Sequence, residues 1–420
     1  MKSISKIRGF SDILDQEARK FTLMEDTAKA VFPRYGFREL RLPVLERTEL
    51  FARSIGDETD VVQKEMYTFP DRKGRYLTLR PEATAGAVRA YIENKLHSRQ
   101  GVTKLYTLGP MFRYERPQKG RQRQFHQINA EAFGSSSPFL DTEIILMLWA
   151  FLQELGLTRL SLELNSLGCR ECRPVYSQSL HSFLQGVDSQ GFCQDCRSRM
   201  STNPLRLFDC KQEKCQELLR EAPSVLDCLC QDCRQHFNTV RDSLDRQGVN
   251  YRINPWLVRG LDYYQRTTFE VVSGEIGAQS SVAGGGRYDD LVSQLGGPDH
   301  PGIGFACGME RLSLLLPDPD PGELDFYLAV LTPEAFVQGS AICDQLRRQG
   351  YSGEMNREVA SVKSQTRHAD RLGAKLCLFL GEQEMESGEL GIKDMQTGEQ
   401  HSGTAETAAQ IREKQKGQRR

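Results

Sequence analysis

The sequence predicts an α+β protein whose main domain is built on a mostly antiparallel sheet flanked by helices. β-prone runs follow one another at short separations over residues 38–166, which is typical of antiparallel neighbours. The composition then changes at Cys169: nine of the twelve cysteines lie between Cys169 and Cys233, in a polar and mainly helical pattern. Finally, Pro317-Asp318-Pro319-Asp320-Pro321-Gly322 cannot form regular structure and predicts a stiff linker before a small α/β unit.

The 420 residues suffice for two or three domains, each with its own core. The cysteine-rich segment interrupts the main domain, since strand patterns return at Tyr251. We therefore expect five consecutive regions: the first segment of the main domain (1–166), a helical Cys-rich insertion (167–248), the second segment of the main domain (249–316), a linker (317–322) and a C-terminal α/β unit (323–420).

Within the main domain, apolar periodicity predicts helices near 17–35, 84–97 and 141–155. It predicts strands at 38–46, 66–69, 76–80, 104–115, 124–133 and 160–165. The run from Arg38 to Glu46 contains Pro43, which has no N–H for a central ladder, so this run is expected at an edge or an interface. The longest apolar run, Ile144 to Leu152, is too short to span a bilayer and predicts a buried helix, not a membrane protein.

Charge and cysteine usage narrow the function classes. Lys and Arg number 55 against 56 Asp and Glu, with a net charge of -1, so nucleic-acid binding would depend on local patches. Residues 1–6 lack the apolar core of a secretory signal. Twelve cysteines without such a signal predict a reducing, cytoplasmic location in which close pairs bind metal or remain thiols.

The CxxC pairs of the insertion predict one structural zinc ion. The first expected ligand set is Cys193, Cys196, Cys230 and Cys233, and the alternative set is Cys169, Cys172, Cys210 and Cys215. The competing interpretation is free thiols in a reduced helical domain. Cys307, Cys343 and Cys377 have apolar neighbours in the sequence and are expected to be small core residues.

The segment from Met111 to Gly134 predicts a hairpin with a long basic tip. On its return arm, period-two alternation places Phe125, Gln127, Asn129 and Glu131 on one face and Ile128, Ala130 and Ala132 on the other. A face that mixes amides, a carboxylate and a phenyl ring suits a polar, partly aromatic ligand. The alternative is an ordinary surface hairpin with a solvated tip.

Four further segments carry polar residues between a strand and a turn or helix. They are Arg80-Pro81-Glu82-Ala83-Thr84, Leu257 to Tyr264 (LVRGLDYY), Ser281 to Asp290 with three successive glycines, and Gly302 to Leu312. Taken singly, each segment also fits a purely structural role: a helix start, a strand-end turn, a flexible loop or an amphipathic helix.

Taken together and in this order, the segments resemble the histidyl-tRNA synthetases of the class II aminoacyl-tRNA synthetase family. The 38–46 run resembles motif 1, which forms the dimer interface in that family, the 111–134 hairpin resembles motif 2 and residues 302–312 resemble motif 3. Residues 257–264 and 281–290 resemble the two histidine-specific signatures. The resemblance implies a class II-type antiparallel sheet and a C-terminal anticodon-binding domain.

The resemblance also implies site residues. Catalysis would depend on Arg259 and Arg113, and histidine would be bound by Glu82, Ala83, Thr84, Gln127, Glu131, Arg259, Tyr263 and Tyr264. ATP would be bound by Arg113, Glu115, Arg121, Phe125 and Arg311, and the tRNA acceptor end by Arg116, Gln118 and Arg123. Arginine forks match phosphate oxygens, and a phenyl face stacks on a purine.

The implied activity is that of a histidine-tRNA ligase: ATP with Mg²⁺ activates L-histidine to histidyl-adenylate, and the 3′ end of tRNA-His takes the histidyl group. The implied assembly is a homodimer. The alternative is a non-catalytic, histidine-sensing paralogue, the regulatory subunit of ATP phosphoribosyltransferase. Loss of Arg259 or of the C-terminal unit would point to that paralogue, and this sequence keeps both.

Overall fold

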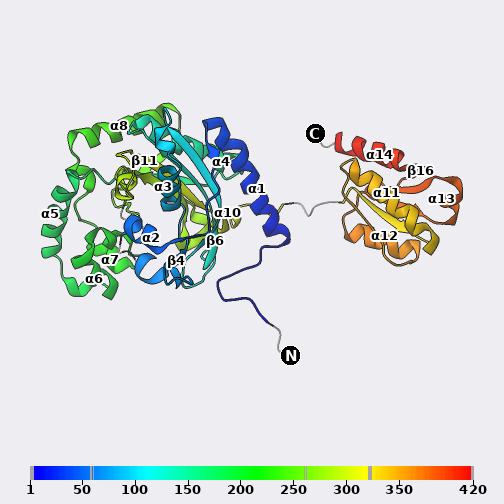
Figure 1. The fold of residues 1–420 in the computed structure, drawn as a ribbon, viewed down its shortest axis with the longest axis horizontal. Helices are drawn as coiled ribbons and strands as arrows, with labels where there is room; N and C mark the ends of the chain where they lie inside the picture. The colour runs from blue at the N-terminus through cyan, green and yellow to red at the C-terminus, as the bar shows by residue number, and fades with distance from the viewer. Residues whose placement is uncertain are drawn as a thin grey trace. The chain divides into compact units, whose positions relative to one another are not determined.

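The largest sheet joins strands from both sides of the insertion (Figure 1). A computed structural model describes residues 4–56, 59, 61–259, 261, 263–319 and 324–417. Among these, the sheet has eight strands in the order β1 (Arg38–Glu39), β5 (Thr103–Phe112), β6 (Gln124–Phe133), β11 (Gly302–Gly308), β10 (Ser281–Arg287), β9 (Gln265–Val272), β7 (Ser161–Ser166) and β8 (Tyr251–Ile253). Neighbours pair antiparallel except β1 with β5 and β7 with β8, so the predicted mainly antiparallel sheet is confirmed.

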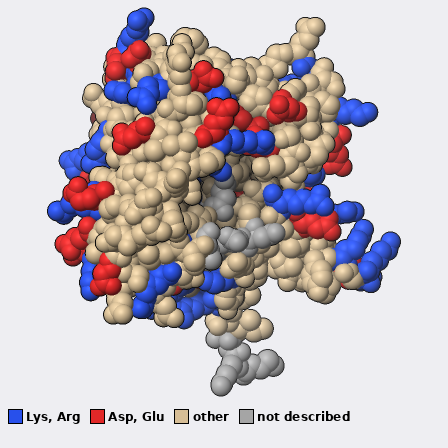
Figure 2. All heavy atoms as spheres, turned by 90° about the vertical axis from the view of Figure 1, so that its left-hand side faces the viewer, with Lys and Arg blue, Asp and Glu red and all other residues tan. Residues whose placement is uncertain are grey.

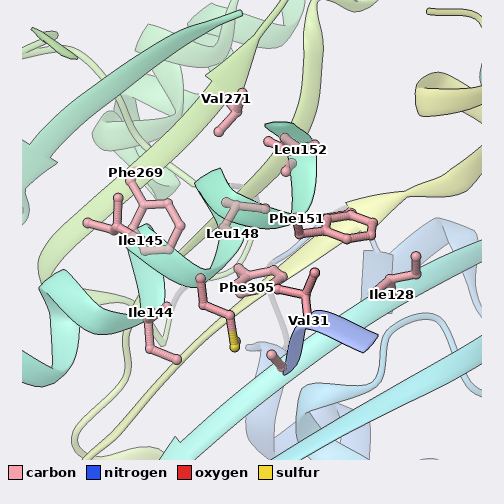
Figure 3. Close-up of a cluster of buried hydrophobic side chains, with 14 of the residues drawn as sticks. Val31, Ile128, Ile144, Ile145, Leu148, Phe151, Leu152, Phe269, Val271 and Phe305 are labelled. Carbon is pink, nitrogen blue, oxygen red and sulfur yellow. The ribbon is translucent and has the colours of Figure 1, made fainter. Parts of the chain in front are cut away.

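The buried faces of several helices pack with this sheet in the main core. The helices of the main domain are α1 (Asp15–Val31), α2 (Thr48–Ile55), α3 (Thr84–Glu93), α4 (Pro138–Glu154), α9 (Leu291–Gln294) and α10 (Met309–Ser313). Helix α4 contains the longest apolar run and is buried as predicted: Leu148 and Phe151 are fully buried, and they gather with Phe305 of β11 in the cluster of Figure 3. Ile128, Ala130 and Ala132 of β6 belong to the same core, which confirms the predicted apolar face of that strand.

The expected strand over 38–46 is wrong, because the chain breaks around Pro43. β1 lies at the edge of the large sheet, whereas β2 (Leu45–Arg47) joins β4 (Tyr76–Leu79) and β3 (Tyr67–Pro70) in a separate three-stranded sheet. Between them, Arg80 Nη1 donates to the carbonyl oxygen of Leu42 (3.2 Å), so a side chain takes the place of a strand partner. The proline itself cannot donate to a ladder.

The insertion follows β7 and is helical, as predicted. Its helices, green in Figure 1, are α5 (Cys172–Gln185), α6 (Gln194–Thr202), α7 (Glu213–Leu218) and α8 (Gln231–Arg246). They enclose a small core of their own in which Tyr176, Leu180 and Leu207 pack with three cysteines. Helix α8 packs against α4 of the main domain, and His236 of α8 makes a 2.8 Å hydrogen bond with the fully buried Asp141.

The chain divides into two compact units, residues 1–318 and 319–420. The second has a five-stranded sheet among its described residues, in the order β13 (Gly353–Met355), β12 (Phe326–Val330), β14 (Leu376–Leu380), β15 (Leu390–Asp394) and β16 (Gln400–Gly403). Its helices are α11 (Phe336–Arg348), α12 (Val362–Arg371), α13 (Glu382–Ser387) and α14 (Ala405–Gly417). The predicted α/β architecture of this unit is confirmed.

Some predicted features lie outside the described residues. They are Gly260 and Asp262 in the 257–264 segment and Asp320, Pro321 and Gly322 of the linker. None of the described helices combines the length and the apolarity that crossing a membrane requires.

Candidate active site

A cavity of about 1400 Å³ opens in the first unit. All five residues expected to bind ATP line it, namely Arg113, Glu115, Arg121, Phe125 and Arg311. Three of the residues expected to bind histidine also line it, namely Gln127, Arg259 and Tyr264. The walls come from the β5–β6 hairpin, from the segment after β8, from strands β9 to β11 and from the insertion.

Among the arginines that line this cavity, Arg113, Arg121, Arg259 and Arg311 lie close enough to repel one another. Burial lowers the pKa of Arg113, Arg121 and Arg311, and in each case a neighbouring arginine lowers it further. Such a concentration of partly desolvated positive charge is costly without anions. Guanidinium forks pair with phosphate or carboxylate oxygens, so an anionic group held between these four arginines would offset that cost.

Arg259 is fixed by its surroundings. Its Nη1 donates to Glu270 Oε1 (2.7 Å), and its guanidinium lies 5.8 Å from the centroid of the Tyr264 ring. Burial lowers the pKa of Arg259, but the Glu270 carboxylate and the Tyr264 and Tyr263 hydroxyls together outweigh that effect and raise it. The guanidinium also occupies the space beside Gly284, where a Cβ would stand 2.6 Å from Arg259 Cζ. Glycine at position 284 is thus a steric requirement for this position of Arg259.

The wall that carries the ATP-binding candidates pairs cations with a ring and a carboxylate. Arg113 Nε donates to the carbonyl oxygen of Pro81 (2.9 Å), and its guanidinium lies 5.3 Å from the centroid of Phe125. Arg121 forms an ion pair with Glu115, whose side chain is nearly buried. Arg311 Nη1 donates to the carbonyl oxygen of Ser281 (2.7 Å), which places motif 3 against the β10 strand.

Two further histidine-binding candidates, Thr84 and Glu131, form a buried polar cluster with Tyr288, and none of the three lines the cavity. Thr84 Oγ1 and the Tyr288 hydroxyl donate to the two oxygens of Glu131, the first at 2.7 Å. Burial raises the pKa of Glu131 to about 8 despite these two donors. The site accommodates this carboxylate because residue 304 is glycine: a Cβ there would stand 2.6 Å from Glu131 Cδ.

Glu82 has a structural task in this structure. Its carboxylate accepts the backbone N–H groups of Thr84 (2.5 Å) and Ala85 (2.9 Å), and so it caps the start of α3. Burial raises the pKa of Glu82, and these two N–H donors oppose the shift. Ala83 is buried next to this cap, and α3 begins at Thr84.

Three buried polar atoms around the site have no hydrogen-bond partner among the described residues. They are Gln127 Oε1, Arg259 Nε and the Tyr263 hydroxyl. An unsatisfied buried polar atom is costly, so a ligand atom that bonded any of these three would stabilise the structure. All three belong to residues that the sequence assigned to histidine binding.

The residues assigned to the tRNA acceptor end lie on the tip of the hairpin and do not line the cavity. Arg116 and Gln118 are exposed. Arg123 is half-buried: its Nε donates to the carbonyl oxygen of Glu115 (3.1 Å), and its guanidinium lies 3.9 Å from the Tyr114 ring centroid. The exposed pair is therefore accessible to a partner, whereas Arg123 also stabilises the tip.

Sequence reasoning missed several residues. Tyr288 and Glu270 were not among the assigned site residues, and only the fold shows that Tyr288 bonds Glu131 and that Glu270 bonds Arg259. Arg287 of the second signature is structural: it is fully buried and its Nε donates to Asp141 Oδ1 (2.8 Å). The insertion also lines the cavity, with Arg206, Leu207, Phe208 and Asp209, and nothing in its sequence signalled this.

Both predicted cysteine ligand sets are wrong in their pairing. The structure brings Cys169 and Cys172 together with Cys230 and Cys233, and separately Cys193 and Cys196 with Cys210 and Cys215. The reason is topological, because the first pair follows β7 and the last pair begins α8, the helix that packs on α4 and leads back to the main domain. Cys307, Cys343 and Cys377 lie in apolar cores, as predicted.

Comparisons with known proteins agree with the geometry. Residues 9–312 match the family model of histidyl-tRNA synthetase, and residues 325–414 match that of the anticodon binding domain. The histidine–tRNA ligase of Nitratidesulfovibrio vulgaris is 58% identical over 402 residues, which is 96% of each chain. That of Oleidesulfovibrio alaskensis is 59% identical over 95% of this chain and 97% of its own. The apo histidyl-tRNA synthetase structure from S. aureus superimposes with a TM-score of 0.81 at 34% identity, covering 98% of this chain and 100% of that one.

Proposed function

We infer the chemistry of this cavity from one premise: the chain belongs to the histidyl-tRNA synthetase family and is a histidine–tRNA ligase. The observation that carries the residue assignments is that Arg113, Arg121, Arg259 and Arg311 line one cavity with Gln127 of β6, the strand that also carries the buried Glu131. The arginines suit the phosphates of ATP, and the cluster suits a small polar ring.

We propose that ATP lies along the β5–β6 hairpin. Arg113 and Arg259 hold the α-phosphate, while Arg121 and Arg311 hold the outer phosphates. The adenine stacks on Phe125, which lines the same wall. Mg²⁺ enters with ATP as a component of the substrate and adds positive charge at the phosphates. The lowered pKa values of three of these arginines support this arrangement, because phosphate oxygens would relieve their mutual repulsion.

Histidine is proposed to lie between this nucleotide and the buried cluster. The imidazole has one donor and one acceptor nitrogen in its neutral form, and Glu131 and Tyr264 supply the complementary partners. Glu82 and Thr84 face the α-ammonium beside Ala83 and Tyr263, and Gln127 faces the carboxylate. The proposal is supported by the unpartnered Arg259 Nε, which can donate to the carboxylate, and by the unpartnered Tyr263 hydroxyl, which can accept from the α-ammonium.

The reaction then needs no nucleophilic side chain. A carboxylate oxygen of histidine attacks the α-phosphorus of ATP, the bond to the β-phosphate oxygen breaks, and pyrophosphate leaves with the electron pair. In the second step the 3′-terminal ribose hydroxyl of tRNA-His attacks the histidyl carbonyl, and AMP leaves. Arg259 and Arg113 act by orienting the reactants and by stabilising the negative charge that gathers at phosphorus.

The partners follow from the two units. We propose that residues 325–414 bind the anticodon of tRNA-His, and that Arg116, Gln118 and Arg123 of the hairpin tip meet its acceptor end. Lys and Arg side chains alternate with Asp and Glu side chains over the face seen in Figure 2, so tRNA contacts would be local.

A homodimer through the motif 1 region is supported by the edge position of β1 and by the exposed Val44 and Leu45. The proposed location is the cytoplasm.

Histidine-dependent exchange of pyrophosphate into ATP tests this proposal. The purified protein should catalyse exchange when L-histidine and Mg²⁺ are present. It should not catalyse exchange without an amino acid, or with histidinol, which lacks the carboxylate. Histidine binding without exchange would instead favour the histidine-sensing paralogue.

A further inference from the structure

Eight cysteines of the insertion gather into two groups of four. The neck tetrad is Cys169, Cys172, Cys230 and Cys233, and the wall tetrad is Cys193, Cys196, Cys210 and Cys215. Within each tetrad, all four sulfur atoms lie within 4.8 Å of one another. All twelve cysteines of the chain, each among the residues that the structure describes, are free thiols.

The sulfur separations match a metal site. Four sulfurs about 2.3 Å from a central zinc, at the corners of a tetrahedron, are about 3.8 Å apart. In the neck tetrad, Cys169 Sγ lies 3.7 Å from Cys172 Sγ and 3.8 Å from Cys230 Sγ. In the wall tetrad, Cys193 Sγ lies 4.0 Å from Cys210 Sγ. In a disulfide the two sulfur atoms would be only about 2.0 Å apart.

The backbone around each tetrad also suits charged sulfur. The N–H of Cys230 donates to Cys172 Sγ (3.1 Å) in the neck tetrad. In the wall tetrad the N–H of Cys193 donates to Cys215 Sγ and that of Cys196 to Cys193 Sγ, both at 3.4 Å. Such outer donors orient metal-bound thiolates and offset their negative charge.

Packing alone does not account for the two tetrads. Cys307, Cys343 and Cys377 show how this chain uses cysteine as a core residue: each is single among apolar neighbours. The insertion, by contrast, has a small core, and in two places it brings four cysteine side chains together. A small domain with a limited core commonly needs a metal or a disulfide for stability.

We propose that the insertion binds two structural zinc ions, one in the neck tetrad and one in the wall tetrad. A tetrahedral set of four thiolates takes zinc or iron among the common metals, and zinc adds no redox chemistry to a structural site. The proposal does not rest on the ligase assignment, since metal content is measured without substrates.

The neck zinc closes the insertion at its base. Cys169 and Cys172 follow the end of β7, and Cys230 is the N-cap of α8, which leads back to β8. The zinc thereby joins the chain where it leaves and re-enters the main domain. Closing so long a loop reduces the conformational freedom of the unfolded chain and stabilises the fold.

The wall zinc positions a side of the active cavity. Between Cys196 and Cys210 runs the Pro204–Asp209 segment, from which Arg206, Phe208 and Asp209 line the cavity. The helices that begin at the tetrad hold this segment: Arg199 Nη1 donates to the carbonyl oxygen of Arg206 (3.1 Å) and Gln216 Nε2 to that of Cys210 (3.0 Å). Metal binding at the wall tetrad therefore fixes the segment that faces the phosphate-binding arginines.

Metal analysis of the full chain, purified without chelator, tests the stoichiometry. We expect about two zinc ions per chain on the four-ligand rule for structural sites. Cys172→Ser/Cys233→Ser and Cys196→Ser/Cys210→Ser should each retain about one, and the control Cys228→Ser, which changes a cysteine outside both tetrads, should retain about two. Wild-type protein with less than one zinc, or with iron, would overturn the zinc assignment even if the variants fail to fold. So would a control that loses as much zinc as the tetrad variants.

Hydrogen exchange read by mass spectrometry tests the two roles. The wall variant should exchange faster over residues 203–219 and keep its neck protected, and the neck variant should show its largest increase at 167–173 and 229–246. A wall variant that has lost zinc but keeps wild-type exchange over 203–219 would overturn the positioning role.

Discussion

Replacing Arg259 gives the sharpest test of the proposed chemistry. Its guanidinium is half-buried, paired with Glu270 at 2.7 Å, and packed where Gly284 has no side chain, so it is in position before substrate arrives. In Arg259→His the ring can no longer make the two-pronged contact to a carboxylate and a phosphate. Loss of one such preorganised contact costs about 3–4 kcal/mol, or roughly a hundredfold to a thousandfold in rate.

The assay is histidine-dependent ATP–pyrophosphate exchange, with ATP affinity measured separately. The rate should fall by about a hundredfold or more. ATP affinity should change little, because Arg113 and Arg311 still hold the phosphates. Arg34→His, at an exposed arginine that pairs with Glu154 and does not line the cavity, is the control and should keep wild-type activity. A folded Arg259→His protein with near-normal exchange would refute the reasoning and make Arg259 a structural residue.

Gly284→Ala tests the same position without removing a charge. The new Cβ would stand 2.6 Å from Arg259 Cζ, so the guanidinium has to move. The exchange rate should fall while the overall fold is kept, as judged by circular dichroism. Gly274→Ala is the matched control, because a Cβ at that glycine meets nothing within 4 Å. Equal effects of the two substitutions would contradict the steric argument.

Three further predictions concern protonation, stability and domain function. Because burial raises the pKa of Glu131 to about 8, the carboxyl is protonated at pH 7 in the free protein; if it ionises to accept the imidazole N–H, histidine binding releases a proton. Calorimetry at pH 7 in buffers of different ionisation enthalpy should detect that release and should lose it in Glu131→Gln; unchanged release in Glu131→Gln would exclude Glu131 as its source. Asp141→Ala leaves the fully buried Arg287 without its main partner and should lower the unfolding free energy by about 3–5 kcal/mol in a denaturant titration, whereas a loss below about 1 kcal/mol would mean that the pair behaves like a surface one. Deleting residues 319–420 should spare histidine-dependent exchange and strongly reduce tRNA charging, with the oligomeric state checked alongside; equal loss of both activities in a folded protein would contradict this division.

Much of the fold could be predicted because its elements have local signals. Alternation along β6 placed Ile128 and Ala130 in the core, and the long apolar run of α4 identified a buried helix. The failure at Pro43 was also local in origin. The sequence shows that Pro43 cannot donate a hydrogen bond within a sheet. It does not show that the strands on either side of Pro43, β1 and β2, join different sheets.

The candidate site was predictable as a set of residues and not as a set of contacts. Motif spacing identified Arg259 and Glu131, but their partners, Glu270 of β9 and Tyr288 just after β10, are brought to them by the pairing of strands in the sheet. The cysteine pairing failed for the same reason. Pairs 61 residues apart meet because the insertion returns to its starting point, and separation along the chain carries no information about that return.

A crystal structure with L-histidine and α,β-methylene-ATP tests the central claim most directly. The account predicts the two imidazole nitrogens at hydrogen-bonding distance, about 2.7–3.2 Å, from Glu131 and Tyr264, with the histidine carboxylate near Gln127. It also predicts that the Arg259 guanidinium contacts both that carboxylate and the α-phosphate. A nucleotide bound away from Arg113 and Arg259, or an imidazole directed away from Glu131, would contradict the assignment of this cavity.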